Sequence, residues 1–362
     1  MAYGQISADN LTSSTGGVIS PNITSLRNRI INGAMVIDQR YSGASQSPAP
    51  SGYSADRWAL FKSGTGTWSY QLSSNAPAGF SSSMLLTVTA TETPSSGDYF
   101  IIQQPIEGFN TYDLSWGTAN AKTITLSAWV YSSVTGTFSG ALRNSATTLS
   151  YAFSYSIPTA NTWTQISVTI PGPTTATWVG ATNGVGIYID FCLSGGSSQL
   201  TAAGSWTSGS YIGATGQTPW ISTSSATFYL TGVQLEVGTQ ATSFDYRPYG
   251  TELQLCQRYY TRLVGNSNNP LVGSGFNSGT TSSWIYGGLP VYMRVAPTVN
   301  YSGLSISDQN TYSASVTSVA ATATTNQTLG ASFGYSSAGT AYKVAVAVLG
   351  SSSTWIDFSS EL

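Results

Sequence analysis

Residues 226–263 read ATFYLTGVQLEVGTQATSFDYRPYGTELQLCQRYYTRL, and this stretch decides the fold because a β pattern gives way to a helical pattern within it. Residues 227–237 are rich in Phe, Tyr, Leu, Val and Thr and contain no proline, which predicts a strand. The apolar residues of this strand change parity around Gly232. Either a β-bulge at the glycine or a strand covered on both faces explains the change.

Beyond Pro248 the spacing becomes helical and predicts a short helical neck over 250–263. A helix of about a dozen residues is marginal alone in water, so it must pack on a domain wall or on sister copies of itself. We expect a homotrimer whose helices meet near a threefold axis, because the helix has two apolar stripes and the chain has little charge to oppose association. The residues of these stripes are Leu253, Leu255, Cys256, Tyr259, Tyr260 and Leu263.

The composition excludes several classes of function. Charged residues make up 7% of the 362 residues, against about 25% in an ordinary soluble domain. A net charge of -2 gives no electrostatic reason to bind nucleic acid or an anionic membrane. The sequence has no apolar run of membrane-spanning length and no signal-peptide pattern at its start, so we expect no membrane insertion.

Histidine is absent, which removes Ser-His-Asp and Cys-His catalysis and most zinc sites. The two cysteines, Cys192 and Cys256, stand in apolar segments and are expected to be buried, reduced thiols. No motif for a cofactor or a metal is present. The alternative is a structural calcium shared by Asp56 and Asp245, which requires that the first and last strands of the first domain pair.

The chain divides into four parts by composition. Residues 1–30 are polar and irregular and predict an arm, which is either a flexible leader or a segment that docks onto a larger assembly. Residues 31–249 contain short alternating segments at a spacing typical of a jelly roll or a related two-sheet sandwich. After the helical neck, residues 264–362 predict a smaller β domain, within which residues 313–332 are either a strand or a loop. The predicted fold class is therefore all-β.

Several segments resemble fibre and other host-facing virion proteins of tailed bacteriophages. They are RIINGAMVIDQR with YSADRW, QQPIEGFN, WGTANAKTITLSAWVYSSVTGTFSGALRNSA and FYLTGVQLEVGTQATSFDYRPYGTELQLCQRYY, with LPVYMRVAPTV as a weaker signal. The resemblance covers about residues 27 to 262. It implies a carbohydrate-binding-module-like jelly roll, then a helix and a variable distal domain, in a virion appendage that is usually trimeric. It carries no catalytic motif.

Aromatic residues are the candidates for sugar recognition, because a pyranose stacks its C–H face on a ring while amides and hydroxyls bind its hydroxyl groups. Trp129 stands on the Thr/Ser face of a predicted strand, although burial against a second sheet or another subunit is the alternative. The other candidates lie in the connection 203–220 or in the distal domain: Trp206, Tyr211, Trp220, Trp284 and Tyr286.

The function expected from the sequence is non-enzymatic attachment of a virion to a host surface glycan. The expected partners are copies of the chain in a homotrimer, other virion proteins through the arm, and the glycan. One alternative is a purely structural capsid or tail decoration. The other is a polysaccharide depolymerase, which requires two opposed carboxylates. The acids that are near in sequence are Asp38 with Asp56, Glu107 with Asp113, and Glu236 with Asp245, and structural charge pairs explain each of them.

Overall fold

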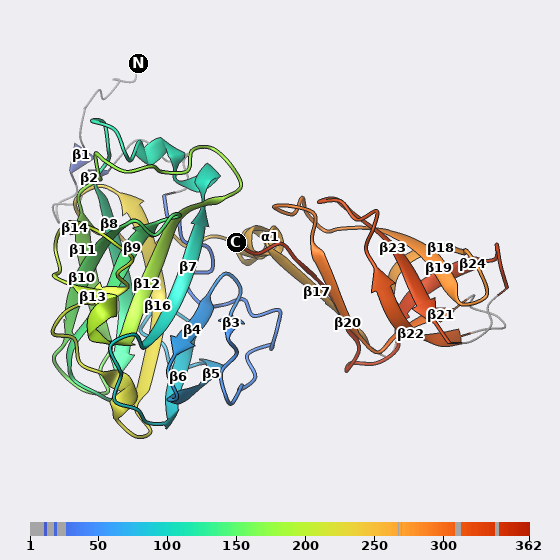
Figure 1. Cartoon of the computed structure of the whole chain (residues 1–362), viewed down its shortest axis with the longest axis horizontal. Helices are drawn as coiled ribbons and strands as arrows, with labels where there is room; N and C mark the ends of the chain where they lie inside the picture. Colours follow the sequence, from blue (N-terminus) through green and yellow to red (C-terminus); the bar gives the residue numbers. More distant parts are fainter. Residues whose placement is uncertain are drawn as a thin grey trace, which may run out of the picture.

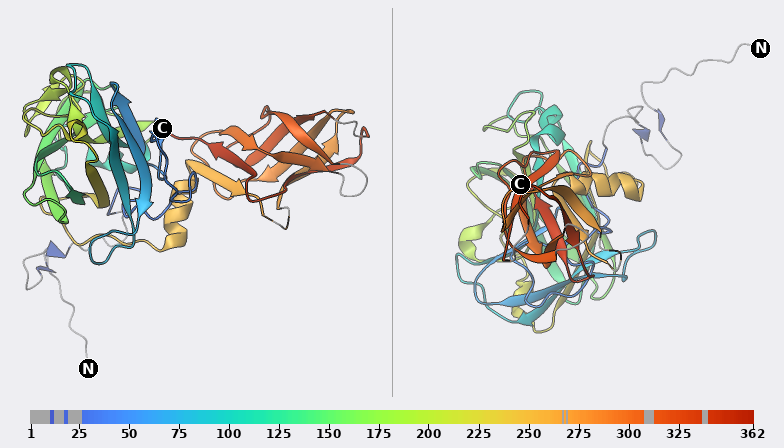
Figure 2. Two further views of the ribbon diagram at one scale, coloured as in Figure 1. Left: turned by 90° about the horizontal axis from the view of Figure 1, so that it is seen from below. Right: turned by 90° about the vertical axis from the view of Figure 1, so that its right-hand side faces the viewer.

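The chain folds into two β lobes that lie end to end, with a short helix beside their junction (Figures 1 and 2). The structure is a computed structural model that describes residues 27–266, 268, 270–307, 313–336 and 340–362, together with the paired strands β1 (Leu11–Thr12) and β2 (Val18–Ile19). Most of the predicted arm over 1–30 thus lies outside the described residues. Its last residues belong to the first lobe, because Asn28, Arg29 and Ile30 are buried there.

The first lobe is a sandwich of two antiparallel sheets. The seven-stranded sheet has the order β14 (Trp206–Ser208), β10 (Leu149–Ile157), β9 (Gly136–Asn144), β12 (Val185–Gly195), β7 (Tyr99–Glu107), β4 (Ala59–Ser63), β3 (Gly52–Tyr53). The five-stranded sheet has the order β11 (Thr164–Ile170), β8 (Ile124–Ser132), β16 (Thr227–Val237), β6 (Ser83–Ala90), β5 (Thr67–Ser73). The connections add β13 (Leu200–Thr201), which pairs with β15 (Gly213–Ala214), and the turns η1 (Gly108–Asn110), η2 (Tyr112–Leu114), η3 (Ser197–Gln199) and η4 (Trp220–Ser222).

Consecutive strands cross repeatedly between these sheets, as a jelly roll requires. The chain passes from β4 to β5, from β6 to β7, from β7 to β8 and from β8 to β9 by changing sheet each time. The inward residues of both sheets form one core that contains Trp58, Phe100, Phe138, Phe191 and Phe228. The predicted all-β fold with a jelly-roll sandwich is confirmed.

Strand β16 contains the bulge that the parity change indicated. Its register against β8 shifts between Thr231 and Gln234, and Gly232 has a φ of 61°. A Cβ at Gly232 would lie 2.7 Å from the Phe80 ring, so glycine is needed for space as well as for conformation. The strand is also covered on both faces beyond the bulge, because Gln234 and Glu236 are buried on the face opposite the core. Both explanations of the pattern therefore apply.

The helix is shorter than predicted. Helix α1 runs over Tyr249–Gln257, and the chain then forms strand β17 (Tyr260–Val264), so the prediction of a helix over 250–263 is wrong for its second half. The cause is tertiary, since β17 pairs with β25 (Trp355–Ser359), a segment far along the chain.

The apolar residues of the predicted neck are mostly used within one chain. Cys256 and Tyr259 are fully buried against Ile31 and Ile37, with Leu253 and Leu255 packed at the edge of this cluster. Tyr260 is 3% exposed, whereas Leu263 is 37% exposed on β17. Cys256, Tyr259 and Tyr260 are therefore not available to a sister helix.

The second lobe is a closed barrel with a small sheet at its base. The barrel has the order β18 (Leu271–Asn277), β19 (Ser282–Gly288), β23 (Thr328–Tyr335), β22 (Ser313–Ala320), β21 (Leu304–Ser307), β24 (Val344–Leu349). The base sheet contains β17, β25 and β20 (Thr298–Ser302). The segment 313–332 thus contains β22 and most of β23. Within the described residues no helix is long and apolar enough to cross a membrane.

Candidate functional site: an aromatic row on the five-stranded sheet

Two of the aromatic candidates in the connection 203–220 serve the core. Trp220 is fully buried in turn η4, 6.0 Å from the Trp68 ring, so the prediction that it contacts a ligand is wrong. Trp206 packs edge to face on Trp116 and Trp178, at 5.5 Å and 5.6 Å between ring centroids. A Gly/Ser-rich connection looks exposed in sequence, but here it folds its tryptophans back onto the sandwich.

Tyr211 lies over the outer face of the seven-stranded sheet, and that face is closed. Asp190 of β12 accepts hydrogen bonds from Arg143 Nε and from Gln103 Nε2, each at 2.7 Å. Ile212 of the same connection packs on Cys192, and burial raises the pKa of the Cys192 thiol to about 12. Side chains and a loop thus cover the middle of this sheet face, and the Arg143–Asp190 ion pair gives it buried charges.

The outer face of the five-stranded sheet is different. Trp129 of β8 lies on this face, half-buried beside the Gly232 bulge, as the alternation predicted. Two residues further along the same face stands Tyr131, whose cross-strand partner on β16 is Tyr229. Trp163, immediately before β11, completes a cluster of three half-buried aromatic residues, none of which is among the candidates predicted from the sequence.

We call Tyr131, Trp163 and Tyr229 the aromatic row. The Tyr131 and Tyr229 ring centroids are 4.9 Å apart at an interplanar angle of 76°, and Trp163 lies 5.5 Å from Tyr131 and 6.1 Å from Tyr229. The Trp163 indole N–H donates to Asn75 Oδ1 at 3.3 Å, which ties the row to the loop after β5. These edge-to-face and tilted contacts hold the rings in fixed orientations, so the site is largely preformed.

Cross-strand register continues the line of the aromatic row across the remaining strands of the sheet. Tyr229 is opposite Leu85 on β6, and Leu85 is opposite Gln71 on β5. With strands about 4.8 Å apart, five strands span about 19 Å, which is the length of a short oligosaccharide. The row is therefore shaped for an extended ligand that crosses the strands.

Neutral hydrogen-bonding groups flank the aromatic row on both sides. On one side, Ser69, Thr87 and Thr227 are opposite one another on β5, β6 and β16. On the other side, the exposed Gln165 is opposite Trp129. Within the described residues, no outward position in the aromatic row or in its two flanks carries a charge.

The two distal candidates stand together on the barrel, away from the aromatic row. Trp284 and Tyr286 lie two residues apart on β19, with ring centroids 6.4 Å apart and an interplanar angle of 15°. Tyr286 is 50% exposed, and Trp284 is half-buried beside Phe276 of β18. Trp284 is opposite Phe276 on one neighbouring strand and opposite Ser332 on the other.

The carboxylates are engaged in structural contacts. Of the 14 acidic residues, Asp9 and Asp308 lie outside the described residues, and each of the remaining 12 accepts hydrogen bonds within the chain. This includes all three pairs considered for glycosidase chemistry. Their partners are Tyr41, Gly43 and Tyr70 for Asp38, Gln39 and Arg40 for Asp56, Arg258 and Tyr259 for Glu107, Arg29 for Asp113, Gln234 and Thr242 for Glu236, and Arg27 and Asn28 for Asp245.

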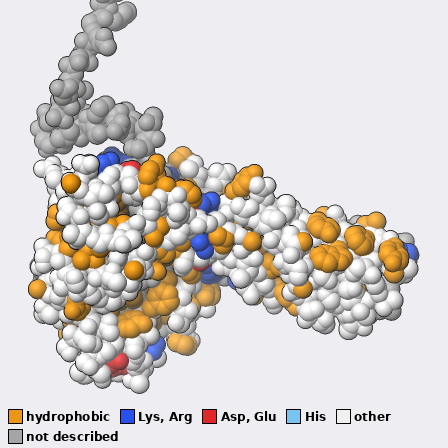
Figure 3. All heavy atoms as spheres, turned by 45° about the horizontal axis from the view of Figure 1, so that its top comes forward, with side chains coloured by type: hydrophobic (Ala, Val, Ile, Leu, Met, Phe, Trp, Pro, Cys, Tyr) orange, Lys and Arg blue, Asp and Glu red, His pale blue; other side chains and the backbone are white. Residues whose placement is uncertain are grey.

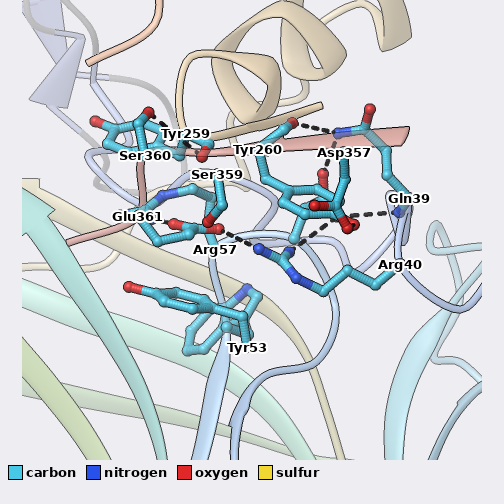
Figure 4. A network of polar contacts seen from close by, with 12 residues as sticks. Gln39, Arg40, Tyr53, Arg57, Tyr259, Tyr260, Asp357, Ser359, Ser360 and Glu361 are labelled. Atoms are coloured by element: carbon cyan, nitrogen blue, oxygen red, sulfur yellow. Dashed lines mark hydrogen bonds and ion pairs between the residues drawn. The ribbon is translucent and has the colours of Figure 1, made fainter. Parts of the chain in front are cut away.

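Ion pairs of Glu361 join the two lobes (Figure 4). Glu361 of the second lobe pairs with Arg57 of the first lobe, and also with Arg40 at 3.0 Å. The Arg57 guanidinium lies 3.6 Å over the Tyr259 ring, and the Arg40 guanidinium lies 3.6 Å over the Tyr260 ring. Because a buried charge that loses its partner is strongly destabilising, this network sets the orientation of the barrel on the sandwich.

Two shallow pockets lie in the surface, and neither is lined by a pair of opposed acids of the kind that a glycosidase requires. One of about 460 Å³ lies near α1 and is lined by serines, Asp38, Leu72 and Tyr249. The other, about 270 Å³, lies at the junction, where Asp357 already accepts from Tyr260 and Arg262. Among the described residues no group of three His, Cys, Asp or Glu side chains is placed to hold a metal ion.

No protein-family model and no curated protein matches the chain. Among solved structures, the chain is similar to the enzymatically active domain of tailspike protein 4 of bacteriophage CBA120, at 16% identity over 58% of this chain and 21% of that one, with a TM-score of 0.30. It thus spans about a fifth of that tailspike chain.

Two sugar-binding proteins are also similar in structure. A putative sugar binding protein from Bacteroides thetaiotaomicron is 11% identical over 59% of this chain and 100% of that one, with a TM-score of 0.32. A family 11 carbohydrate-binding module from Clostridium thermocellum, in complex with a mixed-linked tetrasaccharide, is 10% identical over 55% and 96%, with a TM-score of 0.27. These TM-scores are too low to establish a shared fold, so the description of the sandwich depends on the strand order and core of this chain.

Proposed function

We propose that the chain is a non-enzymatic attachment protein of a virion appendage, which binds a neutral host surface glycan through the aromatic row. The observation that carries the proposal is the combination of three fixed rings with a neutral flank of hydroxyl and amide groups. The resemblance of residues 27 to 262 to host-facing phage proteins supports the place in a virion and the homotrimer. The arm is proposed to dock onto other virion proteins.

The chemistry of the site follows from its residues. The faces of Trp163 and the two tyrosines offer surface on which the C–H groups of a pyranose lose water. Gln165 and Gln71 each offer an amide that both donates and accepts, which suits sugar hydroxyl groups. The absence of charge at the outward positions favours a neutral sugar over an acidic one.

Binding without catalysis is supported by the state of the carboxylates. A glycosidase needs one protonated and one ionised acid on opposite sides of the scissile bond. Neither the aromatic row nor its flanks contain an acid, and the described carboxylates already hold hydrogen bonds elsewhere. Strength is proposed to come from several weak sites on each particle, because linked sites raise avidity without a tight pocket.

The test is binding of the intact chain to purified surface polysaccharide of the host, measured by calorimetry. We expect that the double variant Trp163→Ala, Tyr131→Ala lowers affinity by about 5- to 160-fold, since stacking contributes about 0.5–1.5 kcal/mol per aromatic residue. The matched control is Tyr112→Ala, a 57% exposed tyrosine away from the row, which should bind as the unaltered chain does.

Three results would contradict the proposal. The first is an unaltered chain that binds neither host cells nor their polysaccharide and does not compete with particle adsorption. The second is unchanged binding by the double variant. The third is release of reducing sugar from the polysaccharide, which would favour a depolymerase.

A further inference from the structure

The distal barrel has two unlike halves on its outside. Strands β24, β18 and β19 are neighbours in the barrel, and so are β23, β22 and β21. In each strand alternate residues point into the core, where Ile285, Phe333 and Ala345 are fully buried. The remaining residues point outward, and their chemistry changes from one half to the other.

The outward residues of the first half are mainly apolar, and we call them the apolar side: Leu271, Phe276, Trp284, Tyr286, Val344, Val346 and Val348, with the exposed Ser274 between Val346 and Tyr286 and with Ser282 at one end of β19. They include Val344 at 70%, Leu271 at 55% and Phe276 at 42% exposure, which are unusual values for such side chains. Register places Val344, Phe276 and Trp284 side by side across three strands. Figure 3 shows hydrophobic side chains gathered along one side of this lobe.

The outward residues of the second half are mainly serines, threonines and glycines, with Ala320 at the end of β22, and we call these residues the hydroxyl side: Ser305, Ser313, Ser315, Ser318, Ser332 and Gly334. Register places Ser305 opposite Ser315, and Ser318 opposite Gly334. A barrel that faced water all round would have no reason for this segregation. An apolar patch on one side of a barrel, rimmed by polar residues, is instead a candidate interaction surface.

We infer that the apolar side is where copies of this chain associate, with the hydroxyl sides left facing water. This deepens the homotrimer of the proposed function by locating the contact, and it rests on that proposal only for the existence of an oligomer. The contact replaces the helix-to-helix contact expected from the sequence, because Cys256 and Tyr259 are buried inside the chain.

The chemistry of the apolar side favours a second copy over a sugar. Val344, Val348 and Leu271 have neither a ring face for stacking nor a hydrogen-bonding group. A sugar placed on them would lose water from its hydroxyl groups without replacement, which is unfavourable. Aliphatic and aromatic side chains of an identical neighbour would instead bury each other.

Charge also permits this contact. The apolar side itself carries no charge, Lys343 stands beside Val344 at one end, and the net charge of the chain is only -2, so copies repel each other little. Because the barrel is closed, its six strands offer no free edge for strand-to-strand pairing, and the contact must be made through side chains.

The size of the apolar side is that of the centre of an interface. Three strands about 4.8 Å apart and six residues long, at about 3.4 Å per residue, give a face of about 14 by 20 Å, or roughly 300 Å². A standard interface buries about 800 Å² on each partner, with an apolar core and a polar rim. The apolar side fits the core, and neighbouring polar residues of the barrel would supply the rim.

The first test is the mass of the intact chain in solution by light scattering. We expect an oligomer for the unaltered chain and the mass of one chain for the double variant Val344→Asp, Phe276→Asp. The matched control Ser315→Asp, Ser332→Asp adds the same charge to the hydroxyl side and should keep the oligomer. Thermal melting of each variant checks that the barrel is folded.

The second test needs no disruptive variant. Ser274→Cys and Ser315→Cys place single thiols at exposed positions on the apolar and the hydroxyl halves, while the native Cys192 and Cys256 are buried. In the oligomer we expect the thiol at position 274 to react with a soluble maleimide at least about tenfold more slowly than the thiol at position 315, because an interface core excludes water.

The results that would overturn the inference differ from those that would overturn the proposed function. A single-chain mass for the unaltered protein removes both the inference and the homotrimer. An oligomer that survives Val344→Asp, Phe276→Asp, or equal reactivity of the two thiols, removes the inference and leaves glycan binding by the aromatic row intact. Loss of the oligomer in both charge variants alike also counts against the inference.

Discussion

The aromatic row of the sandwich and the apolar side of the barrel are built in the same way but differ in what surrounds their rings. Each is a line of aromatic residues set by cross-strand register on the outer face of antiparallel strands. Around Tyr131 and Tyr229 stand mainly serines, threonines and glutamines, with Leu85 opposite Tyr229. On the barrel, Phe276 is opposite Val344 and Trp284, and valines and a leucine continue this side, with Ser332 opposite Trp284 at its border. The comparison teaches that the neighbours of an exposed ring, more than the ring itself, distinguish a surface for sugar from a surface for protein.

The largest expected effect separates the two surfaces by avidity. The barrel variant Val344→Asp, Phe276→Asp should leave the affinity of each site for soluble oligosaccharide unchanged, because the aromatic row is intact. Its binding to whole host cells should fall by about 10²–10⁴-fold, since linked sites are lost with the oligomer. Calorimetry with oligosaccharide and a cell-binding assay on the same preparation measure both quantities. Equal loss in the two assays would break the distinction between the surfaces.

The next effect concerns the junction that holds the two surfaces in one orientation. Glu361→Ala leaves Arg57 buried without its carboxylate partner and should lower the free energy of unfolding by about 3–5 kcal/mol. The control Arg27→Ala removes the exposed ion pair between Arg27 and Asp245, 3.8 Å apart, and should change the free energy of unfolding by less than about 1 kcal/mol. Denaturant unfolding of both variants measures these free energies. Similar, small changes in the two variants would mean that the ion pairs at the junction do not stabilise the contact between the lobes.

The pH dependence of the junction should differ from that of the aromatic row. Burial raises the pKa of Asp56 from 3.8 to about 6, so the folded chain holds this proton over a pH range in which the unfolded chain has lost it. The stability that Asp56 contributes is thus fully present below pH 3.8 and is lost as the pH rises through about 6.

Relative to an Asp56→Asn variant, the free energy of unfolding should therefore decrease between pH 4 and pH 7, by on the order of 3 kcal/mol at most, since the shift is about two units at 1.36 kcal/mol each. Denaturant unfolding at several pH values measures this difference. Glycan affinity at the row should stay constant over the same range, and a parallel change in affinity would tie the two regions together.

A smaller effect tests the polar flank of the aromatic row. Gln165→Ala removes an amide beside the rings and should lower glycan affinity by about 3–10-fold, since one hydrogen bond contributes about 0.5–1.5 kcal/mol. Ser167→Ala, two residues further along the same strand, is the matched control and should have no effect. If the Gln165 variant binds normally by calorimetry, the flank does not define the site.

The smallest expected effect is that of salt. Because no charge stands at the outward positions around the row, raising the salt concentration from 50 mM to 500 mM should change the dissociation constant of the oligosaccharide by less than about twofold. Calorimetry at the two salt concentrations makes the measurement. A steep decrease in affinity would indicate an acidic ligand and a site elsewhere.

Much of the fold could be predicted because it follows from local alternation. The alternating residues of 124–130 and 166–170 are strands, and the parity change at Gly232 marks a bulge. The end of the helix could not be predicted, because Tyr259 and Tyr260 suit a helix stripe as well as the buried junction that they form. Only the pairing of β17 with β25 decides between the two, and this pairing joins segments far apart in the sequence.

The candidate site was predicted less well, for a related reason. Trp129 lies on the same face as the aromatic row, and the same alternation extended by two residues reaches Tyr131. Trp163 and Tyr229 join it only through the registers of β11 and β16, which one strand's sequence does not contain. Trp220 is the opposite case. The Gly/Ser-rich sequence around it predicted an exposed loop, but turn η4 buries the ring completely.

The central claim is that sugar and protein partners occupy different aromatic surfaces, and a crystal structure of the intact chain with a host oligosaccharide tests it most directly. The account predicts pyranose rings in contact with Tyr131, Trp163 and Tyr229, and a neighbouring copy seated on Phe276 and Val344. A sugar bound on the apolar side of the barrel, or an aromatic row covered by a neighbouring copy, would contradict it.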